Sequence, residues 1–178
     1  MPFIRPAAFA QDLSTDLEVF QHALQWLSDN ENYVPDFVVQ LRPTSPVRMK
    51  GLIDSCINKL LSNVEADSLR IITEAPVTPY KMWIVENDEK PMKALLNAEG
   101  LKEAYNMPRQ QLPKVYWQIG TLDVIRTKVI TGMNSMSGEH ILPHYIEPHF
   151  AVDIDHDESF NRVAAILKEH RECIQFSE

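Results

Sequence analysis

The chain has 178 residues, and its 17 Lys and Arg residues against 25 Asp and Glu residues give a net charge of −8. That length suits one domain with a hydrophobic core, and the acidic balance argues against binding to nucleic acid or to an anionic membrane surface. The sequence has no run of 18 apolar residues and no secretory-signal pattern, so we expect neither a membrane-spanning helix nor secretion. Its two cysteines are widely separated, which predicts free thiols in a reducing cytoplasm.

The first half of the chain alternates between helical and strand patterns. Residues 14–30 predict a helix, because apolar residues recur at helical spacing and Thr15 and Glu18 have the spacing of a capping box. Cys56 falls on the apolar face of a second predicted helix, which favours packing over chemistry for this thiol. After the first helix, the predicted elements are a strand at 37–41, a helix at 51–63 and a strand at 68–73.

The second half of the chain is less regular. Residues 87–112 are polar and weakly periodic, so we expect loops with one helical turn there. Asp157 is the expected N-cap of the last helix, which carries Phe160 on its predicted apolar face. The predicted elements are a short strand at 81–86, a β-rich stretch at 114–130, two strands within 139–155 and a helix at 157–173.

This order of elements predicts one α/β domain that spans residues 1–178. Helices that alternate with apolar strands are typical of a sheet covered by helices on both faces. The β-rich part, from about residue 114 to 146, breaks the alternation, which indicates a protruding arm or a contact between subunits.

Two carboxylates follow the second strand predicted within residues 139–155. Asp153 and Asp155 stand two residues apart, and such residues point to the same side of a strand. Ligands usually bind at the carboxyl ends of strands in α/β sheets, and Mg²⁺ is commonly held by one or two carboxylates and substrate phosphates. The pair therefore suits a Mg²⁺–nucleotide site. Acids at this position also fit the start of the last helix, where the helix dipole stabilises them.

The segment LRPTSPVR, residues 41–48, places hydroxyls and guanidinium groups directly after a predicted strand. Thr44 and Ser45 lie between Arg42 and Arg48, and such groups suit a phosphate or a carboxylate. A proline-rich turn with solvated arginines is the alternative interpretation of the same pattern.

Two further cations, Lys81 and Arg109, are each flanked by prolines and apolar residues. Stiff loops of this kind can hold a cation beside a ligand. Taken alone, however, the pattern fits surface bases with partly buried stems better than it fits a binding site.

Four of the six histidines lie between His140 and His156. Although His140 and His144 would face one side of a strand, Pro143 and Pro148 interrupt the geometry and no cysteine accompanies them. We therefore expect surface or interface histidines. A metal- or histidine-based hydrolase ranks last among the possible functions, because no nucleophile or base is recognisable.

Five segments of the sequence, in this order, resemble the acylneuraminate cytidylyltransferase family, the CMP–sialic acid synthetase-like enzymes: RPAAFAQD, LRPTSPVR, TPYKMW, PRQQLP and VDID. The resemblance extends from Pro2 to about Leu167. It implies a Rossmann-like nucleotidyltransferase fold with three α/β/α layers and a β-rich dimerisation element at about 121–145. It also implies transfer of CMP from CTP to the anomeric hydroxyl of a nonulosonic (sialic-acid-like) sugar, with release of pyrophosphate, in surface-glycan biosynthesis.

The resemblance also implies a role for each matching side chain. Asp153, Asp155 and Lys81 are implied as catalytic groups, and the two carboxylates also as ligands of Mg²⁺. Fixed cations and a metal suit the reaction, because they stabilise charge on the attacked α-phosphate and orient the carboxylate of the sugar. A homodimer is the expected assembly. The implied substrate-binding residues, for CTP and the sugar acid, are Arg5, Arg42, Thr44, Ser45, Arg48 and Arg109.

Three positions depart from the family's pattern. The family has Gln where this chain has Arg42, Asn where it has Ile119, and Asp where it has Ser159. The first two departures favour a related nonulosonic acid at least as much as N-acetylneuraminate itself.

The family begins with a strand and a Gly-Ser-Lys loop around the nucleotide phosphates, whereas this sequence begins after that point. We therefore expect an N-terminally truncated fold with an open apolar sheet edge. The sequence is then a fragment, or it pairs with a separate N-terminal fragment, or it no longer catalyses. In the last case the chain is a sugar-acid-binding or dimerisation module that pairs with a full-length relative.

Overall fold

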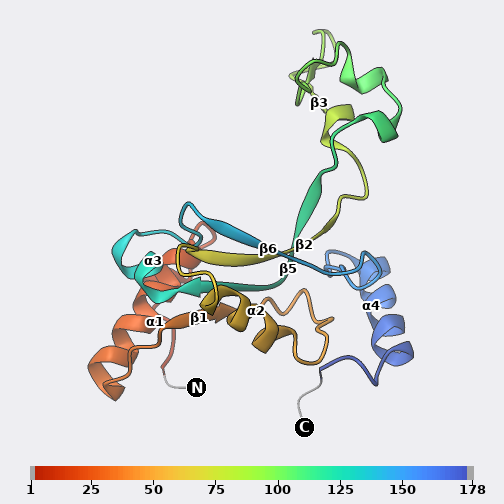
Figure 1. Cartoon of the computed structure of the whole chain (residues 1–178). Helices are drawn as coiled ribbons and strands as arrows, with labels where there is room; N and C mark the ends of the chain where they lie inside the picture. The colour runs from red at the N-terminus through yellow and green to blue at the C-terminus, as the bar shows by residue number, and fades with distance from the viewer. Residues whose placement is uncertain (1–2, 176–178) are drawn as a thin grey trace.

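The computed structural model describes residues 3–175. It contains a four-stranded sheet with helices on both faces, and an arm projects from one end of the sheet (Figure 1). The strands are β1 (Phe37–Gln40), β2 (Ser68–Glu74), β3 (Trp83–Ile84), β4 (Lys93–Ala94), β5 (Tyr116–Arg126) and β6 (Ile141–Tyr145). The α-helices are α1 (Asp16–Glu31), α2 (Leu52–Leu61), α3 (Thr127–Gly132) and α4 (Asp157–Glu169). The 3₁₀ turns are η1 (Ala7–Phe9), η2 (Pro79–Lys81), η3 (Ala104–Asn106) and η4 (Arg109–Gln111). No helix within the described part of the chain is long and apolar enough to cross a membrane.

The four-stranded sheet is mixed, with the strand order β1-β5-β2-β6. Strand β5 runs antiparallel to both β1 and β2, whereas β6 runs parallel to β2. The ladder between β2 and β5 is irregular in its middle, because Arg70 lies opposite Asp123 but Ile72 lies opposite Gln118. The extra residues of β5 form a bulge around Gly120. Such bulges often re-aim side chains beside functional sites.

Helices cover both faces of this sheet, which confirms the predicted three layers. On one face α2 packs against β2 and β5, in a cluster that includes Cys56, Leu69 and Val124. On the other face α1 and α3 pack against β5 and β1, in a cluster that includes Leu24 and Ile125. Val124 and Ile125 are adjacent along β5 and therefore point to opposite faces. Cys56 is fully buried, as its predicted packing role requires.

The two long terminal helices begin in different ways. The capping box predicted for the first helix is confirmed: Thr15 is the N-cap of α1, and its backbone N–H donates to Oε2 of Glu18 at 3.1 Å. The prediction for the last helix is wrong by one residue. His156, not Asp157, is the N-cap of α4, because the His156 Nδ1 accepts the backbone N–H of Ser159 at 3.1 Å.

Two other predictions for this part of the chain are wrong. Phe160, expected on the apolar face of α4, is 58% exposed, and the helix buries other apolar residues. Of the two strands predicted within 139–155, only β6 forms. The segment that carries Asp153 is held instead by a backbone bond from the Ile154 N–H to the Thr44 carbonyl at 2.8 Å.

An arm of residues 77–115 projects from the end of the sheet where β2 ends and β5 begins (Figure 1). Its own small core is built on Ala98, Ala104 and Leu112. The arm contains strands β3 and β4 and the turns η2, η3 and η4. Residues 87–112, expected as loops with one helical turn, contain two 3₁₀ turns, η3 and η4, and the short strand β4.

The segment 121–145, assigned to dimerisation, begins in the buried centre of β5, continues through α3 and ends in the edge strand β6. The β-rich pattern thus ends in a helix, since Val129 and Ile130 pack with Leu24 of α1 despite their β-branched side chains. A role in dimerisation stays a prediction. Within the segment, exposed residues that could meet a partner lie mainly from residue 131 onward.

Candidate functional site

Three segments that are distant in the sequence meet at the bulge of β5. They are the turn after β1 that carries Ser45, the bulge itself at Gly120, and the extended segment at Asp153. The Ser45 hydroxyl donates a hydrogen bond to Oδ1 of Asp153, and the Ile154 N–H bonds the Thr44 carbonyl beside it. The predicted P-T-S-P turn and one predicted metal carboxylate are therefore in direct contact. Ser45 is almost fully buried, whereas Thr44 is exposed.

Gly120 lies where these segments approach most closely. A Cβ atom at this position would be 2.8 Å from the Ser45 Oγ, 3.0 Å from Cδ of Arg42 and 3.3 Å from Oδ1 of Asp153. Glycine is thus required here for close approach. No pattern in the sequence assigns this residue to the site, because it carries no functional group.

Arg42 is held by a buried carboxylate behind the contact. Its Nη1 donates to Oδ2 of Asp123 at 3.1 Å, and the Asp123 side chain is fully buried while that of Arg42 is 31% exposed. Oδ1 of Asp123 is buried too, without a hydrogen-bond partner among residues 3–175. The guanidinium group of Arg42 is therefore held by Asp123, while part of the side chain remains exposed to solvent. Sequence reasoning missed Asp123, although a carboxylate inside the apolar run TLDVI was an available signal.

Arg48 braces the turn that carries Ser45. Its Nε donates to the Thr121 carbonyl at 3.1 Å, and its Nη2 donates to the Arg42 carbonyl at 2.7 Å. Burial lowers the pKa of Arg48 from its usual value. Both contacts are to backbone, so Arg48 fixes the turn relative to β5. Its predicted contact with a substrate stays a prediction.

Asp155 lies beside the start of α4. Its backbone N–H donates to Oγ of Ser159 at 2.9 Å, and the same oxygen accepts the His156 N–H at 3.1 Å. The Asp155 side chain is exposed. Asp155 thus lies at the N-terminal end of α4, one residue before its N-cap His156, and Asp153 contacts the turn. Metal binding by the two carboxylates stays a prediction.

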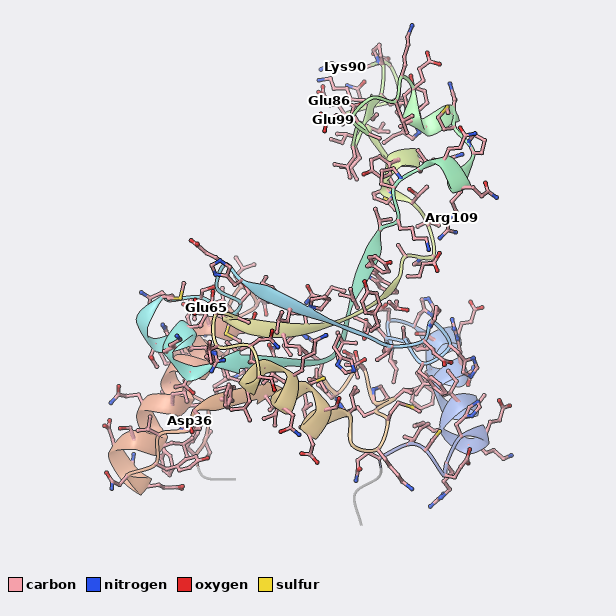
Figure 2. All side chains as sticks on the ribbon, viewed as in Figure 1. Asp36, Glu65, Glu86, Lys90, Glu99 and Arg109 are labelled. Carbon is pink, nitrogen blue, oxygen red and sulfur yellow. The ribbon has the colours of Figure 1, made fainter. Side chains whose placement is uncertain are left out.

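The two cations expected near a sugar acid lie on the arm. Lys81 is the last residue of η2 and is exposed. Arg109 stands at the base of the arm (Figure 2), where it donates to the carbonyls of Ala75 at 2.7 Å and Pro76 at 3.2 Å. A cavity of about 240 Å³ opens beside Arg109, with Glu74 on its wall. The hydrogen bonds of Arg109 are thus to residues at the base of the arm and not to Ser45 or Asp153. The predicted roles of Lys81 and Arg109 stay predictions.

Arg5 is exposed on the segment that precedes α1. Its neighbours Phe3 and Phe9 both pack against His22 of α1, with ring centroids 5.1 and 5.5 Å apart. Arg5 is not among the groups that contact Ser45 or Asp153. Its predicted role near the nucleotide stays a prediction.

The residues at the contact fit a divalent cation by their donor chemistry. Mg²⁺ prefers carboxylate oxygens and takes its remaining ligands from phosphates and water. Asp153 is only half-buried and has a second oxygen beyond the one that Ser45 contacts, and the exposed Asp155 follows two residues later. Asp153 and Asp155 would hold the metal, and Ser45 would orient Asp153.

No protein-family model matches the sequence, and no curated protein matches it. Two solved structures are similar. CMP:2-keto-3-deoxy-manno-octonic acid synthetase in complex with CTP matches with a TM-score of 0.54 and 9% identity, over 89% of this chain and 70% of that chain. The 4-diphosphocytidyl-2C-methyl-D-erythritol synthase from Anaerococcus prevotii matches with a TM-score of 0.52 and 15% identity, over 86% of this chain and 67% of that chain.

At these identities the likeness concerns the fold. Membership in the acylneuraminate cytidylyltransferases and the N-terminal truncation stay predictions. The predicted fold class is confirmed: the chain has the α/β nucleotidyltransferase fold of these two enzymes, with a mixed sheet between layers of helices.

Proposed function

We propose that the chain is a cytidylyltransferase, which transfers CMP from CTP to a nonulosonic or closely related sugar acid and releases pyrophosphate. One observation carries the proposal: Ser45, Gly120 and Asp153 converge in a chain with the fold of two enzymes whose products carry a cytidine phosphate. One of these enzymes was solved with CTP, and its name contains a sugar acid. The first fact supports CTP as the nucleotide here, and the second supports an acidic acceptor.

In the proposed reaction, the oxygen of an acceptor hydroxyl attacks the α-phosphorus of CTP, and the bond from that phosphorus to the pyrophosphate oxygen breaks. The hydroxyl loses its proton to water, and pyrophosphate leaves. Mg²⁺, when bound, supplies positive charge to the phosphates. Asp153 and Asp155 would hold this ion, and the hydrogen bond from Ser45 would fix the orientation of Asp153. Arg42, anchored by Asp123, offers its remaining N–H groups to a phosphate oxygen.

The carboxylate of the acceptor needs a cation that is held in place. Arg109 meets this condition, because two backbone carbonyls fix its guanidinium beside the cavity at the base of the arm. Lys81 lies on the same arm and is available as a second cation. Closure of the arm over a bound nucleotide would bring these groups to the acceptor, and such positioning removes much of the barrier.

Pyrophosphate release tests the proposal. The assay combines the chain, CTP and Mg²⁺ with a panel of sugar acids that includes N-acetylneuraminate and 2-keto-3-deoxy-manno-octonate. We expect turnover with at least one acid, and CTP should be preferred over ATP, GTP and UTP. Asp153→Asn should lower kcat by about 100-fold or more, as removal of a group that stabilises transition-state charge does. Asp157→Asn, an exposed position in the first turn of α4, is the matched control.

Two results would overturn the proposal. One is the absence of turnover with every acid, both for the chain alone and after addition of the N-terminal strand and loop from a full-length relative. The other is an equal loss of activity in Asp153→Asn and Asp157→Asn, which would show that the contact with Ser45 has no special role.

A second candidate function is favoured by the edge of the sheet. Strand β1 pairs with β5 on one side, and within residues 3–175 no strand pairs with its other edge. An open edge invites pairing with another chain. The chain would then be a sugar-acid-binding or dimerisation module that pairs with a full-length relative. Calorimetry that detects sugar-acid binding without CTP binding would favour this candidate over the enzyme.

The homodimer and the cytoplasmic location are further parts of the proposal. The arm supports a dimer, because exposed apolar side chains gather on it and such patches commonly mark protein contacts. These side chains include Val77, Ile84, Val85, Leu95 and Leu96. Light scattering after size exclusion should give twice the mass of one chain.

A further inference from the structure

Three side chains of the types that commonly ligate metals lie beyond the C-terminal end of α4. His170, Glu172 and Cys173 each offer one ligand atom, and these three atoms all lie within 4.8 Å of one another. Within the described residues, no other trio of His, Cys, Asp and Glu side chains has this geometry. The proposed cytidylyl transfer uses none of the three residues.

We propose that His170, Glu172 and Cys173 form a site for a transition-metal ion, and that Zn²⁺ fits it best. Imidazole nitrogen, thiolate and carboxylate are the usual ligands of Zn²⁺, whereas Mg²⁺ and Ca²⁺ prefer sites built from oxygen alone. With Zn–N of about 2.0 Å and Zn–S of about 2.3 Å, tetrahedral ligand atoms lie roughly 3.5 Å apart. Small rotations of these side chains therefore complete the site.

The backbone around the group is held in place by the segment that follows the P-T-S-P turn. The Lys50 N–H donates to the Cys173 carbonyl at 2.9 Å, and Met49 and Ile174 form an antiparallel bridge. Ligands on a fixed turn lose little conformational freedom when they bind an ion. The Cys173 thiol now bonds the His170 carbonyl at 3.3 Å, and it would give up its proton and this bond to the metal.

His149 adjoins the group from the turn after β6. Its ring centroid lies 5.1 Å from that of His170, at an interplanar angle of 77°. Two imidazoles on one tetrahedral Zn²⁺ have centroids about 5 Å apart, given Zn–N bonds of about 2.0 Å. A rotation of the His149 ring would make it the fourth ligand. Phe150 packs against His170 at 5.2 Å and lends the site an apolar wall.

A metal at this position would stabilise the candidate functional site through the apolar cluster that contains Cys173. Cys173 packs into an apolar cluster with Val47 and Val152, which are close neighbours in sequence of Ser45 and Asp153. A bound ion would therefore stabilise the packing of the C-terminal segment against the two segments that carry Ser45 and Asp153. Its role would be structural, and it does not depend on the identity of the reaction.

Metal titration of the full chain tests this inference. Protein freed of metal with a chelator is titrated with Co²⁺ and then with Zn²⁺. We expect one Co²⁺ per chain, a sulfur-to-cobalt charge-transfer absorption, and displacement by one equivalent of Zn²⁺. Cys173→Ser should abolish the absorption, and His170→Asn and Glu172→Gln should weaken Zn²⁺ binding at least tenfold. His140→Asn, an exposed histidine outside the group, is the matched control and should bind as the wild type does.

A second readout covers variants that fold poorly. Zn²⁺ should raise the melting temperature of the wild type and of His140→Asn by several degrees, because binding to the folded state stabilises it. The rise should be absent in His170→Asn, whose circular dichroism checks its fold. Failure of the wild type to bind Co²⁺ stoichiometrically at micromolar concentrations would overturn the inference. So would an absorption that persists in Cys173→Ser, since another thiol would then hold the metal.

Discussion

At Gly120 the absence of a side chain lets three segments touch. The nearest side-chain atoms belong to Ser45, Arg42 and Asp153, and all lie within 3.3 Å of the point that a Cβ would occupy on the β5 bulge. A methyl group there must displace a buried hydroxyl or the carboxylate that it contacts. Gly120 therefore matters to the proposed chemistry through the geometry of its neighbours.

Gly120→Ala should lower turnover about tenfold or more, because a displaced Asp153 no longer holds the metal in the productive position. The chain should still fold, since the clash involves side-chain atoms. Gly132→Ala is the matched control, because a Cβ at Gly132 meets no atom within 4 Å. Steady-state kinetics of the two variants compare the positions, and equal activities would contradict the role of Gly120.

The ion pair between the partly exposed Arg42 and the buried Asp123 leads to a prediction about stability. Arg42→Leu removes the one partner of the Asp123 carboxylate among the described residues, and it should lower the free energy of unfolding by about 3 kcal/mol. Lys90→Ala breaks an exposed pair with Glu86 at the tip of the arm (Figure 2) and should cost less than about 1 kcal/mol. Urea denaturation measures both. A loss in Arg42→Leu no larger than in Lys90→Ala would be inconsistent with a buried, paired Asp123.

At the scale of elements, local patterns predict most helices and strands. The apolar spacing of α1 and α2 and the capping box at Thr15 are local signals, and the structure confirms them. The helix α3 was missed, because Val129 and Ile130 favour strands on their own and only packing on Leu24 selects the helix. The strand expected at Asp153 does not form, since its partner is a turn and not another strand.

The candidate site was predicted only in part. Ser45 and Asp153 were selected by their chemistry, and the structure brings them together. Their contact depends on which strands neighbour each other, and one sequence does not contain that information. For the same reason Gly120 and Asp123 were missed, as was the group of His170, Glu172 and Cys173, although the His-x-x-Cys spacing was visible.

The contact between the start of β2 and the start of β6 leads to a prediction about how stability depends on pH. Asp67, just before β2, accepts the backbone N–H groups of His140 at 3.0 Å and Glu139 at 2.9 Å. These hydrogen bonds lower the pKa of Asp67 from its usual value. A lowered pKa adds stability that is fully present above the unfolded pKa and is lost as the pH falls through the folded pKa.

Asp67→Asn should therefore be less stable than the wild type at pH 7, and the difference should shrink as the pH falls below about 4. Asp88→Asn, an exposed aspartate on the arm, is the control and should show little difference at either pH. Urea denaturation between pH 3 and 7 provides the measurement, and a difference that grew toward low pH would contradict the sign of this linkage.

At the scale of the whole molecule, the arm has a much smaller hydrophobic core than the sheet. Strands β3 and β4 have two residues each, and the arm's cluster has three buried residues, none of them fully buried. The sheet, by contrast, is packed by helices on both faces. The arm should therefore open locally without unfolding the sheet, which suits a part that closes over a substrate.

Hydrogen exchange tests this difference. Amides of residues 77–115 should exchange at least 100-fold faster than those at the centre of β5, because local opening of the arm costs less than unfolding the sheet. Mass spectrometry of peptic fragments resolves the two regions. Equal protection of both would mean that the arm and the sheet unfold as one unit.

The central claim is that the turn after β1, the bulge of β5 and the segment before α4 form one site for a metal-bound nucleotide. Mn²⁺ takes the same oxygen ligands as Mg²⁺ and broadens nearby amide signals in NMR spectra. With Mn²⁺ and CTP together, the account predicts the strongest loss at Ser45, Gly120, Asp153 and Asp155, and no such loss in Asp153→Asn. Broadening confined to other parts of the chain, or independent of CTP, would contradict it.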